Sequence, residues 1–407
     1  MSRRAAGHHV WRSIRRGLAT GTAALLALLG GGILVLEARA IGDALERPGL
    51  AAFYALPDPV PSGSPGEILR VEELIGVPFD SRGWRVLYHS TDLDGEDVVV
   101  SAIVVTPLGP APTEGRPVLA WGHPTTGVAR DCAPSLGADP FLDIEGLRLM
   151  LDRGYVVVAT DYAGMGVEGP DSYLIGATEG NNVLDAVRAA QAIPGSRAGS
   201  DVVLWGHSQG GQAVLFAAER AADYAPELSI AAVAVAAPAA DLTALLDADI
   251  GDISGVTIGS YAFPAFAAVY GESVEGARLE DILTPAALAA VPEVQELCLL
   301  THTAQLHEIT EPLIGDFVVS DPTTTQPWSD LLAENSAGSV GFDAPLFIAQ
   351  GLADTLIHPS DTEAFAQHEA SLGIDVTLER IPMATHATIA YLSLPALAQW
   401  LDIHGPR

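Results

Sequence analysis

The sequence contains no lysine and little positive charge of any kind. All 20 basic residues are Arg, and they stand against 51 acidic residues, so the 407-residue chain has a formal net charge of −31. A surface this negative repels phosphate, which argues against nucleic acids and anionic lipid headgroups as partners. The charge favours a neutral or cationic small-molecule substrate.

Cysteine is nearly absent, and no cysteine or histidine cluster has the spacing of metal ligands. Cys132 and Cys298 are the two cysteines, and the adjacent His8 and His9 lie in a segment that we expect to be removed. The sequence therefore predicts neither a metal site nor a cofactor. In an exported protein two cysteines favour one disulfide between them, whereas two unpaired thiols would fit a reducing compartment.

An apolar run near the N-terminus stands apart from the rest of the chain. Residues 18–36, LATGTAALLALLGGGILVL, follow five arginines, and ARA at residues 38–40 matches the small-x-small pattern of a signal-peptidase site. We therefore predict a signal peptide over residues 1–40 and a secreted or extracytoplasmic protein. Because the run is just long enough to span a bilayer, an uncleaved membrane anchor is the alternative.

From residue 84 onwards strand-like and helix-like patterns alternate. Residues 84–107 predict two strands joined by an Asp-Gly turn. The later apolar runs are nearly continuous, which is typical of strands covered on both faces, and they are RPVLAWGH, YVVVAT, DVVLWGH, IAAVAVAA, APLFIAQG and VTLERIP. Helical patterns lie between several of them, so the sequence predicts an α/β fold with a mostly parallel sheet flanked by helices.

One interval breaks this alternation. Residues 241–341 contain Ala-rich helical patches and several prolines but no clear buried strand, and the interval is too long for a loop. We predict a helical cap inserted between the sixth and seventh strands. The α/β domain would then consist of residues 41–240 and 342–407.

The stretch GHSQG at residues 206–210 lies between an expected strand and an expected helix. In this context G-x-S-x-G indicates a nucleophile elbow, in which glycines permit a strained turn that lifts Ser208 above the sheet edge. The backbone N–H of Gln209 would then face a developing oxyanion at the helix N-terminus. The alternative is a tight turn in which Ser208 only caps the helix.

A serine nucleophile needs a base and an orienting carboxylate, which follow it along the chain in the order Ser, acid, His. Asp354 comes just after the strand APLFIAQG, and His386 lies between a later strand and a helical pattern. The other acids fit less well, because Asp361 suits the first turn of a helix and Asp375 precedes a strand. The other histidines also fit less well. His358 lies too close to Asp354, His368 falls inside a helical pattern and His404 lies near the C-terminus.

A second oxyanion donor is expected in the loop after the third strand, WGHPTTG, residues 121–127. A backbone N–H of Thr125 or Thr126 could face the oxyanion while His123 supports the loop by hydrogen bonding. A purely structural turn is the alternative. Asp161, after the fourth strand, is expected to line the site or to hold its loops.

Several motifs occur in a recognisable order over roughly residues 50–400: WGHPTTGVARDCAPS, VVATDYAGMG, NNVLDAVRAAQAIPG, WGHSQGG, GLADTLIHP and THA. Together they resemble the secretory lipase family, the α/β-hydrolases that include yeast lipase A. The resemblance implies an extracellular esterase or lipase with Ser208 as nucleophile, Asp354 as acid and His386 as base. It also places the family's oxyanion position near Thr126, where the yeast enzyme has an acidic residue.

These observations predict an exported serine esterase or lipase that hydrolyses acyl esters through an acyl-enzyme. The partner would be a small-molecule or lipid ester, with membrane attachment only through the N-terminal segment. An acyltransferase or an aminopeptidase would use the same three residues and is the alternative.

Overall fold

The computed structural model describes residues 49–406. One compact unit consists of Tyr54–Leu136 and Pro140–Arg407, and, of the described residues, 49–53 and Gly137–Asp139 belong to a second. The fold below is that of the larger unit. The predicted signal peptide or membrane anchor at residues 1–40 lies outside the described residues.

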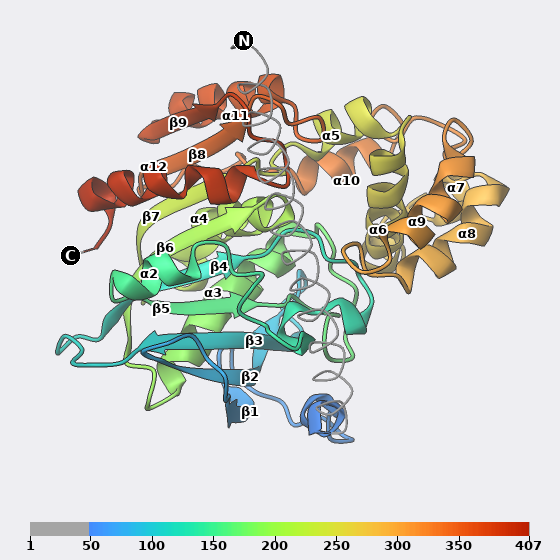
Figure 1. Ribbon diagram of the computed structural model, residues 1–407. Helices are drawn as coiled ribbons and strands as arrows, with labels where there is room; N and C mark the ends of the chain where they lie inside the picture. Colours follow the sequence, from blue (N-terminus) through green and yellow to red (C-terminus); the bar gives the residue numbers. More distant parts are fainter. Residues whose placement is uncertain (1–48, 407) are drawn as a thin grey trace, which may run out of the picture. The chain divides into compact units, whose positions relative to one another are not determined.

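The larger unit is built on a nine-stranded sheet with the strand order β1-β2-β3-β5-β4-β6-β7-β8-β9 (Figure 1). From β1 to β5 along this order the neighbours are antiparallel, and from β5 to β9 they are parallel. The sheet is therefore mostly parallel with an antiparallel start, as predicted. Its strands are β1 (Ile68–Glu73), β2 (Ser81–Thr91), β3 (Asp97–Pro107), β4 (Arg116–Gly122), β5 (Val156–Thr160), β6 (Ala198–His207), β7 (Ser229–Ala236), β8 (Leu346–Gly351) and β9 (Val376–Ile381).

Helices cover both faces of the sheet. Because side chains alternate along a strand, Ala120 and Trp121 of β4 enter two different cores, one on each face. Covering both faces explains the continuous apolar runs of the central strands. One face carries α3 (Gly176–Ala192), α4 (Gln209–Tyr224) and α11 (Pro359–Ser371), and the other carries α2 (Leu147–Asp152) and α12 (Ile389–His404).

The sequence analysis does not predict β1. This strand pairs only with β2, at the edge of the sheet, and its residues ILRVEE are partly or fully exposed. It therefore lacks the apolar run that marks the central strands. With β1 counted, the insertion predicted between the sixth and seventh strands lies between β7 and β8.

The segment between β7 and β8 is helical, and its helices lie together to the right of the sheet in Figure 1. The side chains of Asp241, Asp252 and Thr284 accept hydrogen bonds from first-turn amides and so start α5, α6 and α8. The helices are α5 (Leu242–Asp249), α6 (Ile253–Tyr270), α7 (Leu279–Ile282), α8 (Pro285–Gln295), α9 (Thr303–Thr310), η3 (Glu311–Leu313) and α10 (Trp328–Glu334).

The most apolar of these helices, α6, forms the core of the insertion. By length and composition α6 could cross a membrane, but 61% of it is buried inside the protein. Its Phe263 stacks on Phe317 and meets Trp328 edge to face, with ring centroids 6.1 and 5.3 Å away. Packing within the insertion therefore accounts for the apolar composition of α6.

The turn from β6 into α4 is strained. Ser208 has φ 56° and ψ −118°, and holding a non-glycine residue in such a region costs on the order of 1–3 kcal/mol. The turn is also tight, because a Cβ on Gly210 would lie 1.9 Å from the carbonyl oxygen of Gly122. A Cβ on Gly206 would lie 2.0 Å from the carbonyl oxygen of Gly210. Both positions therefore require glycine.

Cys132 and Cys298 form a disulfide, which confirms the predicted pairing. Cys132 ends η1 (Arg130–Cys132), which precedes η2 (Pro134–Leu136) in the segment after β4, and Cys298 follows α8 in the insertion. Close by, the N–H of Leu299 donates to the carbonyl oxygen of Thr126 at 2.8 Å. The insertion is therefore fastened to the loop after β4 by a covalent bond and a hydrogen bond.

Replacing Gly210 by Ala should destabilise the protein. The new methyl group would meet backbone atoms that cannot rotate away, so we expect a loss of at least about 2 kcal/mol in chemical denaturation. Gly251→Ala is the matched control, because a Cβ there has no heavy atom within 4 Å. Equal stability of the two variants would contradict the close approach of α4 to β4.

Removing the disulfide should lower the melting temperature. The bond links cysteines 166 residues apart, and closing a loop of this length restricts the unfolded chain by about 5 kcal/mol in the entropic treatment. We expect the Cys132→Ser, Cys298→Ser double variant to melt several degrees below the parent. Alkylation of two thiols in the unreduced native protein would show that the bond is absent.

Candidate active site

Three polar side chains meet where parallel strands of the sheet end. Ser208 follows β6, Asp354 follows β8 and His386 follows β9. The Oγ of Ser208 lies 2.9 Å from Nε2 of His386, and Nδ1 of the same ring lies 2.9 Å from Oδ2 of Asp354. The structure thus joins the predicted nucleophile, base and acid in one chain of hydrogen bonds.

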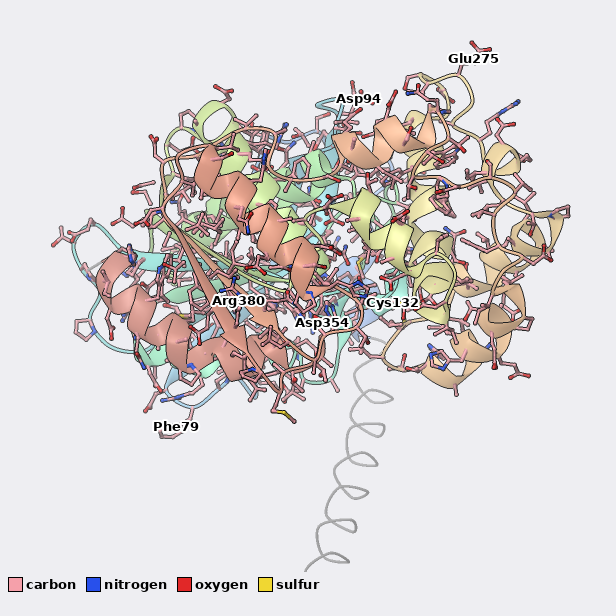
Figure 2. The ribbon with its side chains drawn as sticks, turned by 90° about the horizontal axis from the view of Figure 1, so that it is seen from above. Phe79, Asp94, Cys132, Glu275, Asp354 and Arg380 are labelled. Carbon is pink, nitrogen blue, oxygen red and sulfur yellow. A yellow bond between two sulfur atoms is a disulfide. The ribbon has the colours of Figure 1, made fainter. Side chains whose placement is uncertain are left out.

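Asp354 is buried and held by the loop that carries it. Its Oδ1 accepts hydrogen bonds from the N–H groups of Leu356 and Ile357, at 2.9 and 3.0 Å. Oδ2 is left for His386, so the imidazole donates from Nδ1 and presents the lone pair of Nε2 to the Ser208 hydroxyl. In Figure 2, Asp354 lies in the middle of the view, where the helices of the sheet domain meet those of the insertion.

The acids and histidines set aside in the sequence analysis lie elsewhere. Asp361 is in the first turn of α11, and His358 is the residue that precedes this helix. His368 lies within α11 and contacts the carbonyl oxygen of Gly338, and His404 stacks on Trp400 at the end of α12. Ser208 therefore has its histidine partner in His386 and in none of these.

A second histidine, His207, contacts both the backbone of His386 and a second acid, Glu145. Nε2 of His207 donates to the carbonyl oxygen of His386 at 3.0 Å, and Nδ1 of His207 lies 3.0 Å from a carboxylate oxygen of Glu145. The carbonyl oxygen of Glu145 accepts from the indole N–H of Trp205 at 2.8 Å. His207, at the end of β6, thus ties the loop of His386 to this strand by a hydrogen bond, and the sequence pattern assigns neither His207 nor Glu145 a role.

The predicted oxyanion residues line the same cavity as Ser208. Gln209 is the first residue of α4, so its N–H has no acceptor within the helix. Thr125 and Thr126 lie in the loop after β4 and line the same cavity as Ser208. The hydroxyl of Thr125 hydrogen-bonds Tyr173 at 2.9 Å, whereas that of Thr126 is buried with no hydrogen-bond partner among the described residues.

His123 and Asp161 hold the loops around this region. His123 contacts the carbonyl oxygens of Pro124 and Asp161, and burial lowers the pKa of its imidazole to about 4, so the ring is neutral at neutral pH. The carboxylate of Asp161 accepts hydrogen bonds from the Ser101 hydroxyl and from the Ser135 hydroxyl and N–H. Burial raises the pKa of Asp161 to about 6. Of its two expected roles, Asp161 holds the loops.

A buried acid lies behind Gln209. Glu179, in α3, is inaccessible to solvent, and its Oε1 accepts from the side-chain amide of Gln209 at 2.7 Å. Burial raises the pKa of Glu179 to about 8. Glu179 lies two residues before the NNVLDAVRAAQAIPG motif, and the sequence pattern assigns it no role. The signal that could have identified it is an acid inside a helical segment that is otherwise expected to be buried.

Ser208, Gln209 and His386 open onto a cavity of about 390 Å³. The sheet domain contributes apolar walls at Leu174 and Leu356, and the insertion completes the wall. Such a lining suits a ligand with an apolar part, because the cavity presents mainly apolar surface beside the polar groups of the site. The apolar residues from the insertion are Leu245, Ile253, Ile258, Tyr261, Leu299 and Leu300.

Comparison with known proteins finds relatives that match most of the chain. The chain is 26% identical over 379 residues to a probable inactive lipase of Mycobacterium tuberculosis, covering 86% of this chain and 80% of that protein. It is 26% identical over 394 residues to lipase 6 of Candida albicans, covering 88% and 81%. Among solved structures, Candida antarctica lipase A in its closed state aligns with a TM-score of 0.71 at 19% identity, covering 87% of this chain and 86% of that one.

The last of these similarities shows that the fold is an α/β-hydrolase fold. The family similarity comes from the sequence itself, because residues 141–404, more than half of the chain, match the secretory lipase family. This span runs from the segment before α2 to the end of α12 and contains Ser208, Asp354 and His386. The chain belongs to the secretory lipase family.

Proposed function

We propose that the protein is an exported serine esterase or lipase that uses Ser208, His386 and Asp354 as its catalytic triad. The observation that carries this proposal is the unbroken hydrogen-bonded chain from Asp354 through His386 to Ser208 at the wall of an apolar cavity. Membership of a family of secretory lipases makes an ester the expected substrate.

The reaction is a two-step acyl transfer to water. The Oγ of Ser208 attacks the ester carbonyl while Nε2 of His386 takes the hydroxyl proton. The imidazolium then protonates the leaving alcohol, and in the second step the neutral ring activates a water molecule against the acyl-enzyme. Asp354 keeps the required tautomer and stabilises the imidazolium.

The tetrahedral oxyanion would be held by backbone amides. The N–H of Gln209 is the first donor, since it stands at the N-terminus of α4, where the helix dipole favours negative charge. The second donor is a backbone N–H of the loop at Thr125 and Thr126. The hydroxyl of Thr126 could donate as well, since it is buried and has no hydrogen-bond partner among the described residues.

Residues 241–341 would act as a cap that encloses the acyl chain. The insertion supplies much of the apolar wall of the cavity and is anchored beside the oxyanion loop through Cys298. Residues 41–240 and 342–407 would then form the hydrolase domain. Export is supported by the disulfide, which persists in oxidising compartments.

A binding protein without activity is the contrasting class, and one relative is named a probable inactive lipase. A member of this fold that only binds its ligand would ordinarily lack a member of the triad. Here all three side chains are present and hydrogen-bonded, which favours an active enzyme. Acyltransfer or peptide hydrolysis through the same triad stays the alternative, decided by the acceptor and substrate.

Ser208→Ala should abolish ester hydrolysis and leave the fold intact. The hydroxyl is the nucleophile, so kcat/KM should fall on the order of 10⁴-fold or more. The measurement is p-nitrophenyl ester hydrolysis with circular dichroism as the folding control. A folded variant that keeps more than about a tenth of the parent rate would refute the assignment.

The roles of Asp354 as acid and His386 as base can be tested against control substitutions of a nearby Asp and a nearby His. Asp354→Asn and His386→Ala should each lower kcat by roughly 10³-fold or more. His386→Ala removes the proton acceptor, and Asp354→Asn removes the carboxylate that keeps the acceptor in its correct tautomer. Asp361→Asn and His358→Ala are the matched controls and should stay close to the parent. The reverse pattern would require a different triad.

A substrate panel separates the classes of enzyme. We expect hydrolysis of p-nitrophenyl esters from acetyl to palmitoyl, with the preferred chain length set by the apolar cavity, and little cleavage of matched peptide p-nitroanilides. Faster cleavage of the amides would favour an aminopeptidase. Transfer to an added alcohol in preference to water would favour an acyltransferase.

A further inference from the structure

The carboxyl group of Glu179 connects the nucleophile turn to the cavity wall. Its Oε1 accepts from the side chain of Gln209 at 2.7 Å and from the N–H of Leu174 at 3.0 Å. Gln209 is the residue next to Ser208, and Leu174 lines the cavity. One buried oxygen atom therefore holds two parts of the candidate active site.

Leu174 needs this support because its backbone is strained. It has φ 58°, a left-handed conformation that a branched side chain rarely adopts. Its carbonyl oxygen accepts from the side chain of Gln212 in α4 at 3.1 Å, so the residue is held from both sides. The helix that carries Glu179, α3, packs closely against α4, because a Cβ on Gly180 would lie 2.9 Å from the backbone nitrogen of Ala217.

The surroundings of Glu179 favour its neutral form. Its Oε2 is buried without a hydrogen-bond partner among the described residues, and so is Oε1 of Gln209. The titratable groups that face the carboxyl are Asp171 and the phenols of Tyr162 and Tyr173, and none of these is a cation. Burial accordingly raises the pKa of Glu179 to about 8 in spite of its two hydrogen bonds.

We propose that Glu179 is a positioning residue whose neutral carboxyl group holds Gln209 and Leu174 in the arrangement that oxyanion stabilisation needs, and whose ionisation weakens catalysis. The inference rests on the proposed function, because Gln209 supplies an oxyanion donor only if Ser208 is the nucleophile. A carboxylate at this place would put a negative charge one side chain away from a developing oxyanion, and burial weakens the screening of that charge by solvent.

The test compares pH profiles of kcat and KM for a neutral p-nitrophenyl ester between pH 5 and 10. The parent should lose kcat as the pH rises through about 8. Glu179→Gln keeps the shape and cannot ionise, so we expect kcat at pH 7 within about threefold of the parent and no loss with this midpoint. Glu369→Gln is the matched control: Glu369 is another buried acid, with a pKa raised by burial to about 7, but it lies in α11 outside the cavity lining.

Removing the carboxyl group of Glu179 tests whether it positions Gln209 and Leu174. Glu179→Ala should lower kcat by at least about tenfold and change KM by less than about threefold, because the ester still binds while the oxyanion donors lose their support. A merely structural role would leave the alkaline limb of the parent and of Glu179→Gln the same. If Glu179→Ala does not fold, the Glu179→Gln profile decides alone.

Thermal unfolding gives a readout that does not depend on turnover. The pKa of Glu179 is raised in the folded protein, so its ionisation penalises folding progressively as the pH rises from about 4.5 to about 8. The melting temperature of Glu179→Gln minus that of the parent should therefore increase as the pH rises over this range.

Two results would overturn the inference: an alkaline loss in Glu179→Gln equal to that of the parent, or full kcat in folded Glu179→Ala. Failure of the proposed function is a different result. It would appear as hydrolysis that survives Ser208→Ala, whereas failure of this inference leaves the dependence on Ser208 intact.

Discussion

The close approach of α4 to β4 and β6 is the constraint on which the site depends. At Gly210 the helix backbone touches the strand backbone at Gly122, so the chain must turn within a few residues of the end of β6. Ser208 occupies the strained position in that turn. A looser turn would start α4 farther from the sheet, and the Ser208 hydroxyl and the N–H of Gln209 would no longer share one point at the strand edge.

The parallel sheet brings the other members of the hydrogen-bonded chain to the same place. Carboxyl ends of parallel strands lie along one edge, so residues more than a hundred positions apart, such as Ser208 and His386, can hydrogen-bond at 2.9 Å. The remaining lone pairs and N–H groups are then occupied by neighbours, with Leu356 and Ile357 bound to Asp354 and His207 bound to the His386 loop. The side chains that would react are held by groups that do not react.

The insertion completes the cavity and is coupled to the sheet at several points. The disulfide and the hydrogen bond from Leu299 to Thr126 fasten it to the segment after β4 that contains Thr125 and Thr126. On the other side, Asn335 accepts from the N–H of Gly176 and from the side chain of Gln212, linking α10 to the starts of α3 and α4. The insertion therefore contacts both the loop at Thr125 and Thr126 and the start of α3, the helix that contains Glu179.

The sequence alone was sufficient for the α/β layering, the helical insertion, the disulfide, and the choice of Ser208, Asp354 and His386 as candidates, because burial on both sheet faces and a glycine-flanked turn leave local patterns. It missed β1, whose half-exposed edge position leaves no apolar run, and it gave Glu145, His207 and Glu179 no role. Only the tertiary structure decided these, since a polar residue in an apolar segment does not reveal which distant group it meets. The cavity likewise depends on packing two segments that are separate in the chain.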